Sequence, residues 1–315
     1  MKITVLDKAS LGEDTPFAPL AALGELITYD ATSKEEAIKH IADSDVIVIN
    51  KVKITDEVLS RVPRLKLICV FATGYDNVDL DAARRYGVGV CNVPAYSTSS
   101  VTLFTLSTVL ALVSHLTEYR EFVKSGSYTA AGLPNRLTPV FHEVDGMKWG
   151  IVGYGNIGMA VGEVARAMGA ELLVCKRAPT EGVRCVDIDT LCREADIITL
   201  HCPLNSETRG LINRERLSLM KPTAVLVNEA RGAVLDENAV AEAVLNKQIA
   251  AFGCDVYSTE PFGEPHPYTK IMHLNNVILT PHAAWAAYEA RVRCVNTIKE
   301  NITSYVNGGK LNRID

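Results

Sequence analysis

The sequence contains no C-x-x-C pair, no cluster of basic residues and no fixed-period repeat. Its 8 cysteines stand apart from one another, and most lie in apolar, strand-like runs such as Leu67-Ile68-Cys69-Val70. A disulfide framework is typical of small secreted domains, and a chain of 315 residues buries enough surface to fold without one. We therefore expect buried, reduced thiols in a cytoplasmic chain, and we predict no metal site.

Positive charge is neither abundant nor concentrated. The chain has 32 Lys and Arg against 37 Asp and Glu, which gives a net charge of −5 and an isoelectric point near 5.9. This balance predicts no nucleic-acid partner. Residues 2–7 form a strand-like segment with a charge at each end, which is unlike a signal peptide. The longest apolar helix, around 98–116, carries many Ser and Thr, so we interpret it as a core helix and not as a membrane span.

Short apolar runs alternate with helical patterns along the whole chain, which is typical of parallel α/β sheets covered on both faces. The expected strands are 2–7, 26–30, 46–50, 67–72 and 88–93, and then 148–153, 171–175, 196–200, 223–228, 250–254 and 276–280. The expected helices include 33–42, with a capping box of Ser33 and Glu36, one that begins near 97–100, and 286–306. The pattern predicts two doubly wound parallel-sheet domains, 1–97 plus 286–315 and 98–285.

A glycine-rich turn joins the first strand of the second domain to a helical pattern. Gly153-Tyr154-Gly155-Asn156-Ile157-Gly158 matches G-x-G-x-x-G. Gly153 would make the tight turn, Gly155 would let a pyrophosphate approach the backbone, and Gly158 would let the helix pack closely on the strand. The following helix N-terminus adds unpaired N–H groups and the positive end of its dipole. The segment therefore predicts a dinucleotide site.

The acidic residue that commonly follows such a loop by about twenty positions is absent. The end of the next expected strand carries Lys176 and Arg177 instead. Either this pair only solvates the strand end, or it seats a 2′-phosphate, which a carboxylate would repel. We favour NADP as the cofactor and keep NAD as the alternative.

Three polar residues follow the fourth, fifth and sixth strands of the second domain, where ligands of open α/β sheets bind. They are Arg231, Glu260 and His282. Arginine offers a planar fork to a carboxylate, histidine titrates near neutrality, and a neighbouring carboxylate favours protonated histidine. We expect the three to hold a carboxylate substrate and to move a proton. His201 is the closest rival, although its His-Cys-Pro-Leu setting also fits a loop passing over the cofactor.

Taken together, these motifs resemble the D-isomer-specific 2-hydroxyacid dehydrogenase family from about residue 45 to the end. The resemblance rests on the glycine loop and on 201–208, 228–232, 255–261 and 280–282, while 281–286 further resembles the glycerate dehydrogenase (hydroxypyruvate reductase) branch. It implies a flavodoxin-like substrate domain and a Rossmann cofactor domain.

The resemblance also implies residue roles. Arg231 would bind the substrate carboxylate and carbonyl, His282 would be the general acid–base, and Glu260 would tune His282. Residues 72–77 resemble the substrate loop of the family, whose backbone N–H groups, here at Thr73 and Gly74, hold the carboxylate. Further cofactor contacts are implied for Asn156, Ile157, Cys202, Pro203, Thr208, Ala230 and Asp255.

Two residues depart from the family pattern. Glu229 stands where a small or β-branched residue is usual, and Leu103 takes a place often held by Glu or Gln. Both departures concern substrate preference and not the reaction class.

Two functions of different classes fit the sequence. The first is NAD(P)-dependent reduction of a small 2-keto acid, with hydroxypyruvate or glyoxylate favoured, to the D-2-hydroxy acid, and the reverse, by a homodimer. The second is a non-enzymatic dinucleotide-sensing scaffold or corepressor on the same fold. The retained Arg231, Glu260 and His282 favour the enzyme. A formate dehydrogenase is disfavoured because that relative carries Gln at the position of Glu260.

Overall fold

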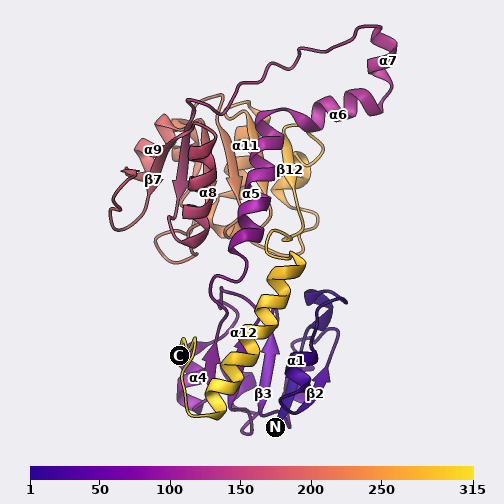
Figure 1. The fold of residues 1–315 in the computed structure, drawn as a ribbon, viewed down its shortest axis with the longest axis vertical. Coiled ribbons are helices and arrows are strands. Elements are labelled where there is room, and N and C mark those ends of the chain that lie inside the picture. The colour runs from indigo at the N-terminus through magenta and orange to yellow at the C-terminus, as the bar shows by residue number, and fades with distance from the viewer. The chain divides into compact units, whose positions relative to one another are not determined.

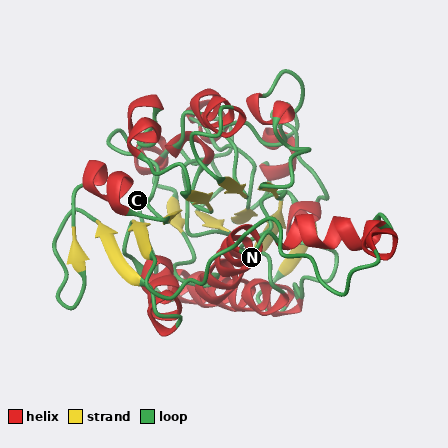
Figure 2. Cartoon of the chain, turned by 90° about the horizontal axis from the view of Figure 1, so that it is seen from above, coloured by secondary structure: helices red, strands yellow, loops and turns green.

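The computed structural model describes residues 1–315 and divides into two compact units. Unit 1 comprises Met1–Ser97 and Ala286–Asp315, and unit 2 comprises Thr98–Trp285. The chain therefore passes from one unit to the other after Ser97 and returns after Trp285. Each unit is built on a parallel sheet, and helices lie on both sides of the strands (Figures 1 and 2).

The sheet of unit 1 has five parallel strands in the order β2-β1-β3-β4-β5, the order of flavodoxin-like sheets. These strands are β1 (Lys2–Val5), β2 (Glu25–Thr28), β3 (Val46–Ile49), β4 (Leu67–Val70) and β5 (Gly89–Cys91). Every residue of β3 and β4 is buried, because the helices of this unit cover both faces of its central strands. The five predicted strands are all present.

The helices of unit 1 come from both ends of the chain. They are α1 (Ala18–Ala21), α2 (Ala37–Ile41), α3 (Asp56–Leu59), α4 (Leu80–Tyr86) and α12 (Tyr288–Val306), with a 3₁₀ helix at Lys8–Leu11. The predicted helix 33–42 is shorter than expected, but its capping box is present. Ser33 N–H donates to Glu36 Oε2 (3.0 Å), and Glu36 N–H donates to Ser33 Oγ (3.3 Å). The final residues close the edge of the sheet, since the Ile314 N–H donates to the Val90 carbonyl (3.0 Å).

The sheet of unit 2 has seven parallel strands in the order β12-β11-β10-β9-β6-β7-β8. These strands are β6 (Lys148–Val152), β7 (Glu171–Cys175), β8 (Arg184–Cys185), β9 (Ile197–Leu200), β10 (Val225–Asn228), β11 (Ala251–Cys254) and β12 (Val277–Leu279). The order matches a Rossmann sheet with one added edge strand, and it reverses between β6 and β9. The prediction of six strands is wrong by one, because β8 has two residues and no periodicity to recognise.

The helices of unit 2 begin with α5 at Thr98, within the predicted start of a long helix. They are α5 (Thr98–Val113), α6 (Leu116–Lys124), α7 (Ser127–Ala131), α8 (Asn156–Ala167), α9 (Ile188–Glu194), α10 (Arg214–Leu219) and α11 (Glu237–Leu245), with 3₁₀ helices at Gly232–Val234 and Pro267–Lys270. Val109 and Leu112 of α5 pack in an apolar core with β6, β9, β10 and β11. Figure 1 shows α6 and α7 projecting away from the sheet of this unit.

No single helix has the length and apolar character needed to cross a membrane. Only α5 and α6 taken together are long and apolar enough, and the chain bends by 66° between them. His115, at this bend, adopts a left-handed backbone conformation with φ 53°. None of the eight cysteines forms a disulfide, and six of them are buried.

Candidate active site

The glycine loop lies between β6 and α8, at the point where the strand order of unit 2 reverses. Gly153 has φ +89°, and a Cβ there would lie 2.6 Å from the backbone nitrogen of Cys202, which follows β9. A Cβ at Gly158 would lie 2.1 Å from the Gly153 carbonyl oxygen, so helix and loop approach too closely for a side chain. A Cβ at Gly155 would meet nothing within 4 Å. The tight turn, the close packing and the open approach that a pyrophosphate needs are thus all present.

The neighbouring loop after β9 carries three predicted cofactor contacts, Cys202, Pro203 and Thr208. The Thr208 hydroxyl donates to the Pro203 carbonyl (2.6 Å), and the Asn205 N–H donates to Thr208 Oγ1 (2.8 Å). Burial raises the pKa of the Cys202 thiol to about 11, so it stays protonated at neutral pH. These contacts fix the shape of the loop beside the glycine turn. The residues of both loops fit a dinucleotide, with Asn156 and Ile157 in the first turn of α8.

Lys176 and Arg177 follow β7 directly and are exposed. The Lys176 ammonium donates to Thr180 Oγ1 (2.5 Å). The Arg177 guanidinium donates to Glu207 Oε2 through Nε (3.1 Å) and Nη2 (2.7 Å). The strand end therefore carries two cations, one of which is paired with a carboxylate from the loop after β9. The sequence did not predict this pairing, because Glu207 lies 30 positions away.

Arg231 follows β10 in a turn that the side chain of Asn228 shapes. The Asn228 amide donates to the Arg231 carbonyl (2.9 Å), and its Oδ1 accepts from the Ala230 N–H (3.0 Å). Asn228 is fully buried, so this turn has a fixed geometry. Arg231 itself is half-buried and has an extended backbone, with φ −150° and ψ 139°. Sequence reasoning assigned no role to Asn228, although an Asn at a strand end before a turn is a recognisable signal.

His282 and Glu260 form a hydrogen-bonded pair. His282 Nδ1 lies 2.6 Å from Glu260 Oε2, and the Tyr257 N–H donates to Glu260 Oε1 (3.1 Å). The side chains remain 24% and 27% exposed, so a small molecule can reach them. The predicted neighbours are thus brought together in one hydrogen-bonded pair.

The loop that carries His282 is held by Asp255, which is 1% exposed. Its carboxylate accepts hydrogen bonds from the Thr280 hydroxyl (2.6 Å), the Ala283 N–H (2.8 Å) and the Ala284 N–H (2.8 Å). His282 has φ 55°, a left-handed conformation that is uncommon for a non-glycine residue. We infer that these bonds maintain that conformation. Asp255 was predicted as a cofactor contact. In the structure its side chain anchors the loop that carries His282.

Tyr257 is a further supporting residue that sequence reasoning missed. Its hydroxyl donates to the carbonyls of Thr280 (2.7 Å) and Cys254 (3.2 Å), which ties the end of β12 to β11. Burial raises its pKa above the range in which it would ionise in ordinary buffers. Tyr257 precedes Glu260 by three positions, and its N–H donates to the Glu260 carboxylate. This spacing is the sequence signal that could have identified Tyr257 as a supporting residue.

His201, the rival histidine, lies directly after β9. Both ring nitrogens are buried without a hydrogen-bond partner, and burial lowers the pKa of His201 to about 4. The ring is therefore neutral near pH 7 and unsuited to donate a proton there. His201 is therefore a weaker candidate acid–base than His282.

The predicted substrate loop belongs to unit 1 and follows β4. The Thr73 hydroxyl donates to the Val93 carbonyl (2.8 Å), and Asn92 Nδ2 donates to the Thr73 carbonyl (2.8 Å). Asn77 Nδ2 donates to the Val52 carbonyl (2.9 Å), which joins this loop to the one after β3. Gly74 lies within the same fixed segment. The substrate contacts of Thr73 and Gly74 stay a prediction.

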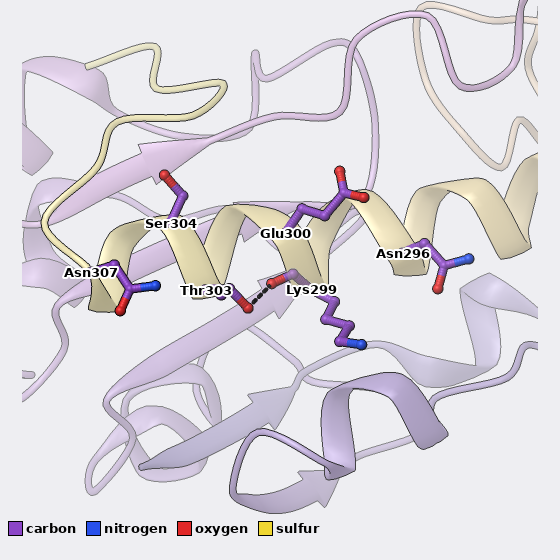
Figure 3. A pocket seen from close by; sticks show the side chains of 6 residues that line it. All are labelled: Asn296, Lys299, Glu300, Thr303, Ser304 and Asn307. Atoms are coloured by element: carbon purple, nitrogen blue, oxygen red, sulfur yellow. Dashed lines mark hydrogen bonds between the residues drawn. The ribbon is translucent and has the colours of Figure 1, made fainter.

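A hollow of about 590 Å³ lies along α12 and is unrelated to these residues. It is lined by Asn296, Lys299, Glu300, Thr303 and Ser304 of α12 and by Asn307 directly after it (Figure 3). The Thr303 hydroxyl donates to the Lys299 carbonyl (2.8 Å), as Figure 3 shows, so it is already engaged by its own helix. The polar side chains do not converge on one point, and the hollow offers no catalytic group. The structure also contains no cluster of three or more His, Cys, Asp or Glu suited to a metal ion.

Comparison with known proteins agrees with this arrangement. Residues 106–284 match the family described as "D-isomer specific 2-hydroxyacid dehydrogenase, NAD binding domain". A hydroxypyruvate reductase from Blautia hydrogenotrophica is 35% identical over 324 residues, which cover 100% of both chains. The solved structure of an acyclic imino acid reductase (Bsp5) with NADPH and D-Arg has a TM-score of 0.88 and 30% identity, and covers 100% of both chains.

A second solved structure differs in its bound cofactor. D-lactate dehydrogenase from Aquifex aeolicus, complexed with NAD and lactic acid, has a TM-score of 0.88 and 29% identity, and covers 100% of this chain and 99% of that one. The family match spans more than half of the 315 residues, and it includes the glycine loop, Arg231, Glu260 and His282. The chain belongs to the D-isomer specific 2-hydroxyacid dehydrogenase family and is an NAD(P)-dependent oxidoreductase.

Proposed function

We propose that this enzyme reduces a small 2-keto acid, hydroxypyruvate or glyoxylate, to the D-2-hydroxy acid, and that it catalyses the reverse reaction. The observation that carries this proposal is the 2.6 Å contact between His282 and Glu260 in the unit that also holds the glycine loop. An imidazole paired with a carboxylate is suited to protonate an alkoxide as it forms. The hydroxypyruvate reductase of Blautia hydrogenotrophica, which is similar over the full chain, supports the choice of substrate.

Each catalytic side chain has one task in this proposal. Arg231 holds the substrate carboxylate and polarises the carbonyl, since its planar guanidinium matches a carboxylate. His282 donates the proton to the carbonyl oxygen during reduction and accepts it back during oxidation. Glu260 orients the imidazole through its contact with Nδ1. When bound, the nicotinamide supplies or accepts the hydride.

The two units divide the work. We assign cofactor binding to 98–285, through Gly153, Gly155, Asn156, Ile157, Gly158, Cys202, Pro203, Thr208, Ala230 and Asp255. Substrate positioning is assigned to Arg231 of 98–285 together with 1–97 plus 286–315, where the backbone at Thr73 and Gly74 would also hold the carboxylate. The fixed loops that carry these residues in each unit support the assignment.

NADP is the favoured cofactor, and NAD is the alternative. Lys176 and Arg177 stand where NAD-preferring folds commonly place a carboxylate. The ion pair between Arg177 and Glu207 is 77% and 67% exposed, so water screens it and a 2′-phosphate can compete for the arginine. One related structure holds NADPH and another holds NAD. Both therefore hold a nicotinamide dinucleotide, and they differ in the 2′-phosphate.

The proposal includes a cytoplasmic homodimer. Its support is the segment from α6 to the start of β6, which projects from unit 2 (Figure 1) and exposes apolar side chains. These are Leu116, Val123, Tyr128, Leu133, Leu137, Val140 and Phe141. A surface of this kind fits a second copy of the chain. Eight cysteines without a disulfide fit a reducing compartment.

A panel of 2-keto acids assayed with both NADPH and NADH tests the proposal. We expect hydroxypyruvate and glyoxylate to give the highest kcat/KM and the product of hydroxypyruvate to be D-glycerate. Phenylpyruvate and branched alkyl pyruvates serve as bulkier comparisons. If no keto acid oxidises either nicotinamide while the dinucleotide still binds, the non-enzymatic scaffold is the better account.

A further inference from the structure

Glu229 is a buried acid that the proposed reaction does not use. It lies directly after β10, between Asn228 and Ala230, in the turn that carries Arg231. Glu229 is 8% exposed, and neither of its carboxyl oxygens has a hydrogen-bond partner. A charged carboxylate in such surroundings is strongly disfavoured, so the group retains its proton.

Three groups face Glu229 from the elements packed around it. Asn228 of β10 pairs with Cys254 of β11, and the Asp255 N–H donates to the Asn228 carbonyl (3.1 Å), so Glu229 and Asp255 follow neighbouring strands side by side. The three groups are the carboxylate of Asp255, the thiol of Cys254 in β11 and the hydroxyl of Thr108 in α5. Burial raises the pKa of Glu229 to about 9, and the negative charge of Asp255 adds to this shift. Burial also holds the pKa of Cys254 well above its ordinary range, so the thiol is uncharged. Asp255 is therefore the charged neighbour with which an ionised Glu229 would interact.

Asp255 connects Glu229 to the catalytic histidine. Its carboxylate accepts the three hydrogen bonds that hold Thr280, Ala283 and Ala284, on both sides of His282. A second negative charge beside it, in a buried site, repels this carboxylate strongly. Ionisation of Glu229 would therefore disturb the anchor of the loop and with it the position of the imidazole.

We propose that Glu229 is a positioning residue that must carry its proton for Asp255 to present His282, so that its ionisation ends catalysis in alkaline solution. This inference rests on the proposed function. It implies that Glu229 sets the alkaline limit of the pH range in which the enzyme is active. A small residue at the same position would not set such a limit.

The test uses the oxidation of D-glycerate by NADP⁺ and by NAD⁺. In this direction His282 must be unprotonated, so its own titration limits the rate only on the acid side. We expect kcat/KM of the wild type to fall about tenfold per pH unit above the pKa of Glu229. Glu229→Gln, which resembles the protonated acid, should retain most of its plateau rate and lose this alkaline limb. The control Glu163→Gln changes an exposed glutamate of α8 and should retain the limb.

An infrared measurement of the carboxyl band gives a readout that does not depend on turnover. We expect a protonated-carboxyl band at neutral pH in the wild type, and its absence in Glu229→Gln. An unchanged alkaline limb in Glu229→Gln, or no such band in the wild type, overturns the inference. A wild type that shows the band but oxidises no D-2-hydroxy acid contradicts the proposed function, and the positioning role of Glu229 with it.

Discussion

His282 differs from the other histidines of unit 2 in what surrounds its ring. A carboxylate engages its Nδ1 at 2.6 Å, the side chain is 24% exposed, and a left-handed backbone fixes its direction. His201 has two buried, unpartnered nitrogens, and His273 is an exposed surface residue. The combination of an acidic partner and solvent access is what acid–base work needs.

We predict that His282→Asn lowers the rate of keto-acid reduction by about 10²–10⁴-fold, the contribution typical of a general acid. Binding of NADPH, measured by its fluorescence, should persist because the glycine loop is unchanged. The control His273→Asn removes an exposed histidine of the same unit and should leave the rate near that of the wild type. A His282→Asn enzyme within tenfold of the wild type would exclude His282 as the acid.

In the proposed mechanism Glu260 acts through His282 and does not itself transfer the proton. We predict that Glu260→Gln retains part of the activity and that the acid limb of kcat/KM for D-2-hydroxy acid oxidation moves to lower pH. The amide keeps the shape of the carboxylate but lacks the negative charge that contacts His282 Nδ1 at 2.6 Å. A pH profile identical to that of the wild type would show that Glu260 has another role.

The end of β7 sets the cofactor preference in this account. We predict that the unmutated protein prefers NADPH and that Lys176→Asp combined with Arg177→Ala shifts the preference toward NADH by about ten- to a hundredfold. A charge-assisted phosphate contact is worth about 1.5–3 kcal/mol, although exposed pairs often contribute less than about 1 kcal/mol. Steady-state kcat/KM with both nicotinamides checks this. Equal or better kcat/KM with NADH before any substitution would refute it.

The packing of α5 against β10 and β11 around Glu229 has a consequence for stability. Because the pKa of Glu229 is raised to about 9 in the folded protein, the unfolded chain releases this proton first as the pH rises. The wild type should therefore lose stability relative to Glu229→Gln between the ordinary glutamate pKa and about 9, by at most about 1.4 kcal/mol per pH unit. Thermal unfolding of both proteins across this range measures the difference. A difference that does not change with pH contradicts the burial of a protonated Glu229.

Most of the architecture could be predicted from the sequence, because buried parallel strands appear as continuous apolar runs. The five strands of unit 1 and six of the seven in unit 2 follow from that pattern. The strand β8 has two residues, Arg184 and Cys185, and leaves no periodic signal. The helix expected at 33–42 begins in the structure only at Ala37, after a turn that the capping box closes.

Only those parts of the candidate site that lie within local sequence motifs could be predicted. Strand ends identify Arg231, Glu260 and His282 because parallel strands bring their carboxyl ends to one edge of the sheet. The pairing of Arg177 with Glu207 and the anchoring of the 280–284 loop by Asp255 join segments that lie 30 and 25 or more positions apart. Such pairings depend on tertiary packing, so no sequence pattern indicates them.

The central claim for the whole molecule is that it transfers a hydride between a nicotinamide and a 2-keto acid that Arg231 holds. The most direct test compares hydroxypyruvate-dependent oxidation of NADPH by the wild type and by Arg231→Ala, with the chirality of the product determined. We predict that the wild type forms D-glycerate and that Arg231→Ala nearly abolishes turnover while NADPH still binds, because only the substrate loses its partner. An Arg231→Ala enzyme with kcat/KM for hydroxypyruvate near that of the wild type would contradict the account.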